Sequence, residues 1–250
     1  MKVVVIIPAA GLGTRMAPVP GGPISGAKDL KAAPPTKQFI ELGGTPILIH
    51  TLRKFAAVEA VREIWIALRE NEIAGLRERL EKEREISGKN IGFVVGGEHR
   101  QQSVANALKA ITAAADDIVL VHDAVRPLVA TEIIHEVIEA AKKYGAAIAG
   151  VPAVDTVKQV ERTAEGAIIK GTIPRAGVVL AQTPQGFRYS VIKKAFDEAA
   201  ADGFKGTDEA SLAERAGHEV AVVMGSHRNI KITTPSDMDL AEFYLKGGSG

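Results

Sequence analysis

The apolar run VVVII at residues 3–7 continues directly into PAAGLGTRM at residues 8–16. A short apolar run that ends in a glycine-rich turn is typical of a buried strand in a parallel sheet. Small residues and glycines let backbone N–H groups approach phosphate oxygens, and Arg15 adds a positive charge there. The turn lacks the third glycine of the dinucleotide-binding pattern and the Gly-Lys-Ser/Thr ending of a P-loop. It therefore predicts a phosphate-binding loop of another kind, with an ordinary strand-to-helix turn as the alternative.

Short apolar runs and helical patterns alternate along the rest of the chain. The runs predict further strands at residues 64–68, 91–95, 118–121, 147–151, 178–182, 220–224 and 230–233. Apolar residues at helical spacing lie between them, with expected helix starts at Thr45, Thr131 and Thr234 and first-turn prolines at Pro46 and Pro235. This order predicts an α/β fold with a mostly parallel central sheet and helices on both faces, in a single domain of residues 1–246.

Three segments depart from this alternation. Residues 156–160 and 167–173 look like two strands joined by a polar turn with no helix between them. They predict a projecting β-hairpin arm over about residues 153–176. Residues 17–35 are rich in Pro, Gly and Ala, and they are expected to form a mobile loop. Residues 247–250 are expected to be a flexible tail.

The composition argues against several classes of function. The 250 residues include 31 basic and 30 acidic side chains, a formal net charge of +1, which argues against a binder of nucleic acid or membrane surfaces. The absence of cysteine excludes disulfides, thiolate catalysis and Cys-based zinc sites. No apolar run has the length of a membrane span. We expect a cytoplasmic protein that binds neither nucleic acid nor membrane.

A second motif, VLVHDAVRP at residues 119–127, predicts a ligand site at the end of a buried strand. Asp123 lies where open α/β sheets bind ligands, and its carboxylate suits Mg²⁺, which prefers carboxylate and phosphate oxygens. Arg126 is a candidate contact for the phosphate of a second substrate. The alternative is a purely structural Asp–Arg pair at the strand end. His122 is expected to pack or to hydrogen-bond rather than to catalyse.

Together these motifs resemble those of nucleotidyltransferases that couple sugars or polyols to nucleotides, and in particular the 2-C-methyl-D-erythritol 4-phosphate cytidylyltransferase family. Further segments have counterparts in that family in the same order: residues 96–104, 155–158, 174–175, 182–187, 206–211 and 229–233. The resemblance spans residues 3–244. It implies transfer of a cytidylyl group from CTP to 2-C-methyl-D-erythritol 4-phosphate, with Mg²⁺ as cofactor, in the non-mevalonate route to isoprenoid precursors.

The resemblance also implies roles for the residues that match the family's motifs. Contacts with cytidine are expected from Ala9, Ala10, Gly97 and Ser103. The triphosphate is expected to meet Gly11, Gly13, Arg15 and Lys37, with Lys231 at the α-phosphate and Asp123 as the metal ligand. Arg15, Lys37 and Lys231 are the expected catalytic groups. The polyol phosphate is expected to meet Arg126, Thr156, Arg175, Thr183 and Thr207. In the family the arm exchanges between the subunits of a homodimer, so Thr156 and Arg175 would serve the neighbouring site.

The sequence departs from the family pattern in two places, and other functions stay open. The loop between Met16 and Lys37 is longer than usual, and Thr36 stands where many members have proline. The nearest alternative function is a cytidylyltransferase for ribitol 5-phosphate or another polyol phosphate. A catalytically silent nucleotide-binding module would be favoured if the phosphate-binding cations were missing, but they are present. A dinucleotide-binding oxidoreductase is weaker still, because the glycine spacing does not match.

Overall fold

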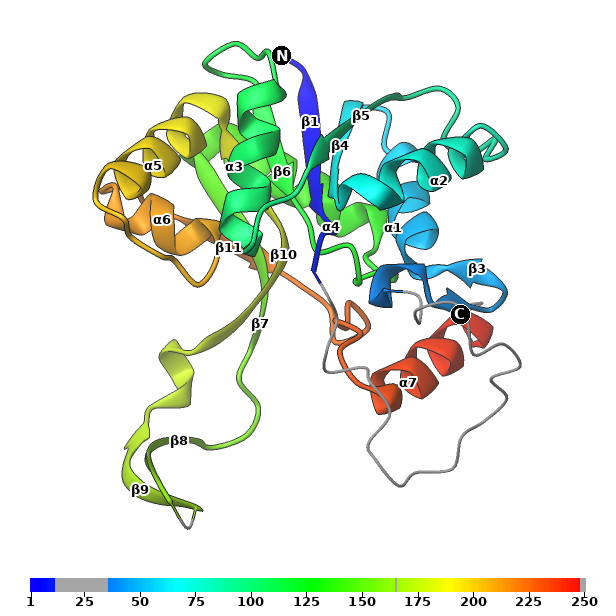
Figure 1. The fold of residues 1–250 in the computed structure, drawn as a ribbon. Helices are drawn as coiled ribbons and strands as arrows, with labels where there is room; N and C mark the ends of the chain where they lie inside the picture. The colour runs from blue at the N-terminus through cyan, green and yellow to red at the C-terminus, as the bar shows by residue number, and fades with distance from the viewer. Residues whose placement is uncertain (12–35, 165, 248–250) are drawn as a thin grey trace.

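The computed structural model describes residues 1–11, 36–164 and 166–247, and its centre is a seven-stranded sheet (Figure 1). The strand order is β11-β7-β10-β6-β1-β4-β5. The strands are β1 Val3–Pro8, β4 Val61–Leu68, β5 Asn90–Val95, β6 Ile118–Val121, β7 Ala146–Pro152, β10 Val179–Arg188 and β11 Ala221–Met224. β10 runs antiparallel to both of its neighbours, and the other pairs are parallel. The predicted mostly parallel sheet is therefore confirmed.

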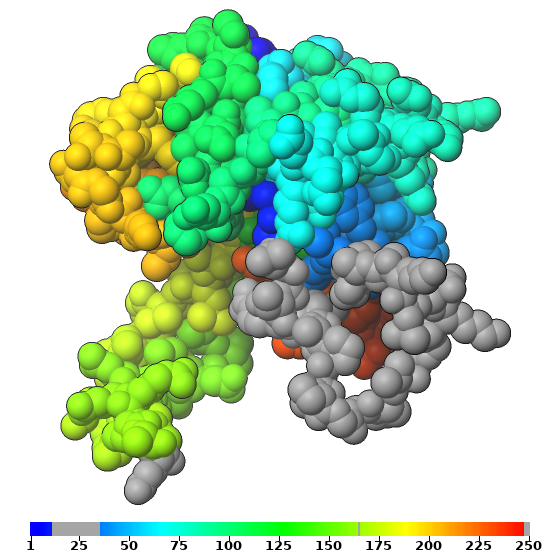
Figure 2. Space-filling view, viewed as in Figure 1, coloured from blue at the N-terminus to red at the C-terminus, as the bar shows by residue number. Residues whose placement is uncertain are grey.

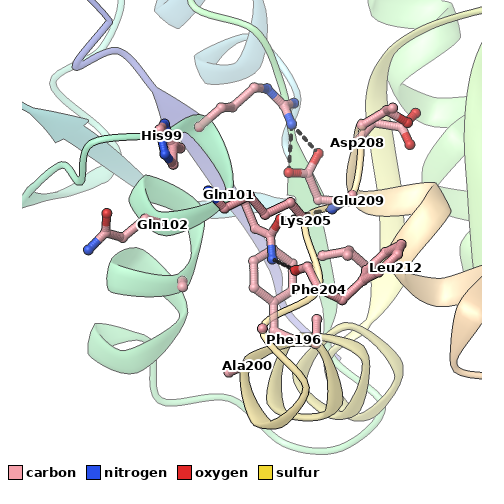
Figure 3. Close-up of a pocket in the computed structure, with 16 residues that line it drawn as sticks. His99, Gln101, Gln102, Phe196, Ala200, Phe204, Lys205, Asp208, Glu209 and Leu212 are labelled. Atoms are coloured by element: carbon pink, nitrogen blue, oxygen red, sulfur yellow. Dashed lines mark hydrogen bonds and ion pairs between the residues drawn. The ribbon is translucent and has the colours of Figure 1, made fainter.

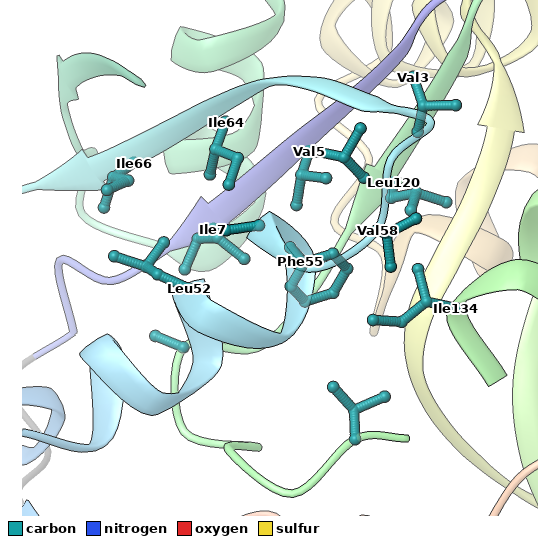
Figure 4. Close-up of a cluster of buried hydrophobic side chains, with 14 of the residues drawn as sticks. Val3, Val5, Ile7, Leu52, Phe55, Val58, Ile64, Ile66, Leu120 and Ile134 are labelled. Atoms are coloured by element: carbon teal, nitrogen blue, oxygen red, sulfur yellow. The ribbon is translucent and has the colours of Figure 1, made fainter. Parts of the chain in front are cut away.

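Helices cover both faces of this sheet, as the sequence predicts. One face packs against α1 (Ile47–Ala56), α2 (Glu70–Leu80) and α4 (Thr131–Tyr144), and the other against α3 (Arg100–Ala110), α5 (Tyr189–Ala201) and α6 (Glu209–Arg215). β1 is apolar throughout because it contacts both layers. Val3, Val5 and Ile7 lie in the first cluster (Figure 4), and Val4 and Ile6 lie in the second. Burial of each such side chain contributes about 1.5–3 kcal/mol.

A smaller substructure packs against the loop that follows β6. It consists of the short helix η2 (Lys37–Phe39), the two-residue strands β2 (Glu41–Leu42) and β3 (Thr45–Pro46), and the helix α7 (Pro235–Lys246). A third apolar cluster joins these parts: Leu42, Ile47, Val125, Ile232 and Ala241. The backbone N–H of Ile232 donates to the carbonyl of Val125 at 2.9 Å. This packing brings the segments around Lys37 and Lys231 to the loop that carries Asp123.

The predicted hairpin arm is confirmed. β8 (Val157–Thr163) and β9 (Gly166–Ile173) pair antiparallel and project away from the sheet (Figure 1), and the arm stands out from the rest of the protein in the space-filling view (Figure 2). The arm leaves the body from β7 and returns to it through β10. Large apolar side chains are exposed on it, among them Val160, Ile168 and Ile169.

Several boundaries differ from those expected. Residues 230–233 were expected as a strand, but the structure has none there; Ile232 donates its backbone N–H to Val125, and no strand ladder forms around it. Thr45 and Pro46 pair with β2, so α1 begins one residue later than expected and Pro46 is its N-cap. Thr131 is the first residue of α4 rather than its N-cap.

Among the strands, β10 differs most in length from the prediction. The apolar run ends at residue 182, yet the strand continues to Arg188. Gln185 and the residues after it pair with both β6 and β7, and these long-range partners extend the strand through a polar segment. The predictions for residues 17–35 and 248–250 lie outside the described residues, and the single-domain organisation stays a prediction. In the part of the chain that the structure covers, no helix has the length and apolarity to cross a bilayer.

The start of α7 agrees with the prediction from Thr234 and Pro235. Thr234 is the N-cap and Pro235 is the first helical residue. One oxygen of Asp237 accepts hydrogen bonds from the backbone N–H and the hydroxyl of both Thr233 and Thr234, at 2.7–2.9 Å. Partial burial acts to raise the pKa of Asp237, but the hydrogen bonds outweigh this effect and lower the pKa to about 2.

We expect Asp237→Ala to lower the free energy of unfolding by about 1 kcal/mol at neutral pH, the usual contribution of a helix cap. The folded-state pKa lies below the unfolded value of about 3.9. The stability difference between wild type and variant is therefore complete above about pH 4 and is lost as the pH falls towards about 2. Urea denaturation across this pH range measures the difference. Asp239→Ala removes an exposed carboxylate from the same helix as a control, and an equal loss in both variants would contradict the prediction.

Candidate active site

A cavity of about 200 Å³ opens at the carboxyl edge of the sheet. Its wall comes from the loops that follow β1, β5 and β6, together with η2 and the segment before α7. The structure brings together here the predicted nucleotide-binding and catalytic residues that it describes: Ala9, Ala10, Gly11, Lys37, Gly97, Ser103, Asp123 and Lys231. Three loops distant in the sequence therefore meet as the resemblance implies.

The loops after β1 and β5 form one continuous wall of small residues. The backbone N–H of Ala9 still bonds to β4 beyond the end of β1. A Cβ at Gly96 would lie 2.3 Å from the Cβ of Ala10, so this close approach requires glycine. The N–H of Gly97 donates to the hydroxyl of the buried Ser103 at 3.0 Å, which holds the second loop against α3. The wall is thus largely backbone and small side chains, which allows close approach of a ligand.

Three cations surround the carboxylate of Asp123. Arg100 Nε lies 3.2 Å from Oδ1, while Arg126 Nε and Lys231 Nζ lie 3.2 Å and 3.0 Å from Oδ2. Burial acts to raise the pKa of Asp123, but the charges of Arg100, Lys231 and Arg126 outweigh it and hold the pKa well below its usual range. Three cationic side chains and two carboxylates, Asp123 and Glu209, make up this cluster, and the excess of one positive charge suits an anionic ligand.

Arg100 is itself held by a second buried carboxylate. Its Nη1 lies 2.6 Å and 2.7 Å from the two oxygens of Glu209, the first residue of α6. Burial acts to lower the pKa of Arg100, but Glu209 and Asp123 raise it above its usual value. No role was predicted for Arg100 or Glu209, although each lies within a segment that resembles the family. The sequence offers one signal for this ion pair: a basic and an acidic residue lie in two segments that both resemble the family.

His122 is connected to the backbone of Asp123 through the hydroxyl of Thr183. Its Nε2 lies 3.1 Å from the carbonyl oxygen of Arg126, which can only accept, so Nε2 carries the proton. The hydroxyl of Thr183 therefore donates to His122 Nδ1 at 3.0 Å and accepts from the N–H of Asp123 at 3.1 Å. Burial lowers the pKa of His122 to about 3, so the ring is neutral. This arrangement agrees with the expected hydrogen-bonding role of His122.

Two of the predicted polyol-phosphate contacts are engaged with the protein itself. Arg126 pairs with Asp123 and donates from Nη1 to the carbonyl oxygen of Asn229 at 2.6 Å. Thr183 is buried beside His122. Neither residue lines the 200 Å³ cavity. The Asp123–Arg126 contact is present in the structure, and direct contact of Arg126 and Thr183 with a substrate stays a prediction.

A larger cavity of about 790 Å³ adjoins the first and shares His99 and Arg100 with it. It lies between α3 and the α5–α6 segment, where Figure 3 shows Glu209, Phe204 and Leu212 around the opening. Thr207 lies on its wall, and the N–H of Thr207 donates to the hydroxyl of Ser211 at 3.1 Å. Thr207 is therefore near the charged cluster but outside the smaller cavity.

Of the remaining predicted site residues that the structure describes, Thr156 and Arg175 line neither cavity. Thr156 and Arg175 are exposed on the arm, and the guanidinium of Arg175 donates to the carbonyl of Val154. Gly13 and Arg15 lie outside the described residues.

Asp123, the predicted metal ligand, lines the 200 Å³ cavity, and its role as a metal ligand stays a prediction. Among residues 1–11, 36–164 and 166–247, no group of three or more His, Cys, Asp or Glu side chains could hold a metal. Mg²⁺ is commonly held by one or two carboxylates together with substrate phosphates. Two carboxylates line this cavity, the buried Asp123 and the exposed Glu98, and so small a number of carboxylates fits an ion that arrives with a nucleotide. It does not fit a metal held by the protein alone.

The fold and the cavity together define a nucleotidyltransferase. A family model for 2-C-methyl-D-erythritol 4-phosphate cytidylyltransferase matches residues 3–247, and the chain belongs to this family. A relative of this name in Acidobacterium capsulatum is 56% identical over 98% of each chain, and one in Solibacter usitatus is 50% identical over 98% of this chain and 96% of the relative.

Solved structures of the family share the fold. The 4-diphosphocytidyl-2C-methyl-D-erythritol synthase of Anaerococcus prevotii superposes with a TM-score of 0.79 at 32% identity, over 98% of this chain and 96% of that one. The 2-C-methyl-D-erythritol 4-phosphate cytidylyltransferase of Thermus thermophilus gives 0.73 at 32% identity, over 98% and 100%. The predicted family and fold class are therefore confirmed.

Proposed function

We propose that this chain transfers a cytidylyl group from CTP to 2-C-methyl-D-erythritol 4-phosphate, giving 4-diphosphocytidyl-2-C-methyl-D-erythritol and pyrophosphate. The observation that carries the proposal is the cluster of Arg100, Arg126 and Lys231 around the ionised Asp123 at the cavity wall. Membership of the family supports the choice of substrates. The absence of cysteine supports a cytoplasmic location.

The reaction needs positioning and charge compensation rather than a general base. A phosphate oxygen of the polyol phosphate attacks the α-phosphorus of CTP, the α–β phosphoanhydride bond breaks, and pyrophosphate leaves. The attacking phosphate is already anionic near neutral pH, so no proton has to be removed from it. Lys37 and Lys231 would stabilise the extra negative charge at the α-phosphate, and Arg15 that of the triphosphate. The neutral His122 agrees with chemistry that uses no proton donor there.

We propose that Asp123 holds Mg²⁺ together with the phosphates of CTP. When bound, the ion would offset charge on the triphosphate and on the departing pyrophosphate. Asp123 is suited to this role because it stays ionised in a buried position. Before CTP and the ion bind, Arg100, Arg126 and Lys231 compensate its charge, so the carboxylate is never left buried without a partner.

Pyrophosphate release tests the substrate directly. CTP and Mg²⁺ are offered with 2-C-methyl-D-erythritol 4-phosphate or with ribitol 5-phosphate, in parallel reactions. Turnover with the first alone supports the proposal. Turnover with ribitol 5-phosphate alone would support the CTP site but show that the acceptor is a different polyol phosphate. If neither acceptor gives pyrophosphate, a catalytically silent nucleotide-binding module would be favoured.

The arm residues point to a site shared between two copies of the chain. Thr156 and Arg175 flank a hairpin that projects away from the central sheet (Figure 1), and neither residue lines the cavity of its own chain. The exposed apolar residues Val160, Ile168 and Ile169 make a covering partner favourable. We propose a homodimer in which each arm supplies Thr156 and Arg175 to the polyol-phosphate side of the partner's cavity.

We expect inactive Arg175→Ala and inactive Lys231→Ala proteins to restore activity when they are unfolded and refolded together. If each arm serves the partner, half of the mixed molecules are heterodimers with one intact site of two, so about a quarter of wild-type activity returns. The mixed sample is assayed beside each variant refolded alone. As a control, Lys37→Ala mixed with Lys231→Ala should restore nothing beyond the single variants if both lysines serve their own chain's cavity. A mixture of the first pair that stays inactive would place Arg175 outside the partner's site.

A further inference from the structure

Both neighbours of Lys37 are hydrogen-bonded to the same carboxylate. Thr36 Oγ1 donates to Glu72 Oε1 at 2.7 Å, and the amide of the buried Gln38 donates to Glu72 Oε2 at the longer distance of 3.5 Å. Lys37 lies between them at the start of η2 and lines the 200 Å³ cavity. Glu72 therefore contacts the chain on either side of a residue that lines the cavity.

Glu72 is a well-placed anchor because α2 holds it. It lies in the first turn of α2, where its side chain accepts from the N–H of Arg69 at 3.4 Å and its own N–H donates to the carbonyl of Arg69 at 3.0 Å. α2 is in turn packed on the sheet through the buried Leu76. The carboxylate thus connects the segment of Lys37 to a fixed element of the core.

The backbone of Thr36 has a conformation that proline would impose. Its φ is −64° and its ψ is 151°. Proline holds φ near −65° through its ring. Threonine has no ring to restrain φ, so the hydrogen bond from its hydroxyl to Glu72 holds the backbone of Thr36 in this conformation instead. The carbonyl of Thr36 then accepts from Phe39 at 2.8 Å and closes the turn that contains Lys37.

We propose that Glu72 is a positioning residue for Lys37, acting through the hydroxyl of Thr36. The inference rests on the proposed function, since it takes Lys37 as a group that meets the α-phosphate of CTP. A lysine side chain has four rotatable bonds, and its ammonium group reaches one point reliably only if its backbone is held. Loss of the anchor should therefore affect the transition state more than the binding of CTP.

The test uses Thr36→Val, which replaces the hydroxyl with a methyl group of similar size, and Glu72→Ala, which removes the acceptor. We expect each to lower kcat about tenfold with a smaller change in KM for CTP. The double variant Thr36→Pro/Glu72→Ala should return kcat to near the wild-type value, because the ring replaces the lost restraint. A merely structural role of Glu72 would not produce this rescue. Glu70→Ala is the matched control: it removes an exposed acid two residues before Glu72 in the first turn of α2 and should keep wild-type kinetics.

Thermal unfolding of all variants separates loss of fold from loss of position. Wild-type kcat in Thr36→Val and Glu72→Ala, with a large loss in Lys37→Ala, would overturn the positioning role and leave the proposed function intact. A loss in Glu72→Ala that Thr36→Pro does not rescue would also overturn it. Normal kcat in Lys37→Ala would instead remove Lys37 from the proposed chemistry, and this inference with it.

Discussion

Replacing Lys231 by alanine should lower kcat about a hundredfold while changing KM for CTP much less. The ammonium group of Lys231 lies 3.0 Å from Asp123 Oδ2 at the cavity wall, where the α-phosphate is proposed to bind. One charge-assisted contact made in the transition state contributes on the order of 3 kcal/mol in such a site. Single-turnover kinetics measure the chemical step directly, and a near-normal rate would remove Lys231 from the chemistry.

The fold should tolerate this substitution. Lys231 is 39% exposed, so its pair with Asp123 is expected to stabilise the protein by less than about 1 kcal/mol. Arg100 and Arg126 still compensate the carboxylate in the variant. A large loss of kcat with a small loss of stability therefore separates a catalytic role from a structural one. Lys193→Ala, on the exposed side of α5, is the control for removal of a surface lysine.

Replacing Glu209 by alanine should have the largest effect on stability, about 3 kcal/mol of unfolding free energy. The substitution leaves Arg100 in a largely buried position without the carboxylate that accepts from it at 2.6 Å and 2.7 Å. Removal of one partner of a buried ion pair typically costs about 3–5 kcal/mol. The lower end applies here because Asp123 still pairs with Arg100 and the arginine is partly exposed.

Urea unfolding at neutral pH measures the effect of Glu209→Ala, and Glu209→Gln is the matched control. Glutamine keeps the volume and one acceptor oxygen, so it should lose less stability than alanine. Equal losses in the two variants would show that the carboxylate charge, which both lack, accounts for the whole effect and that packing of the side chain adds little. A loss in Glu209→Ala with none in Glu209→Gln would show that packing and the remaining acceptor, rather than the ion pair, hold α6 in place. A loss below about 1 kcal/mol in Glu209→Ala would mean that solvent already screens Arg100.

Sequence patterns correctly predict the helices and strands that are determined by residues close to each other in the sequence. The residues of β1 are apolar on both faces, and the Thr234–Pro235 start of α7 depends only on neighbours in the sequence. The pattern also indicates the arm, because two strands without a helix between them have to pair with each other. For these parts, periodicity and capping chemistry are enough.

Elements that depend on distant partners are predicted poorly. β10 continues through a polar segment because β6 and β7 lie on either side of it, and residues 230–233 stay outside the sheet although their pattern resembles a strand. The site divides in the same way. Motif resemblance brings Asp123 and Lys231 together, but only opposite charges in two family-like segments indicate that Glu209 could pair with Arg100 across 109 positions. The sequence does not indicate that the hydroxyl of Thr36 meets Glu72.

β1 and the arm should also differ in the rate at which their backbone amides exchange with solvent. β1 is paired on both sides and covered on both faces, so its amides exchange with solvent deuterium only when much of the sheet opens. β8 and β9 pair only with each other, and most of their side chains are exposed. In an isolated chain the arm therefore opens many times for each opening of β1, and residues 9–11, which begin the loop after β1, are attached to a slowly exchanging strand.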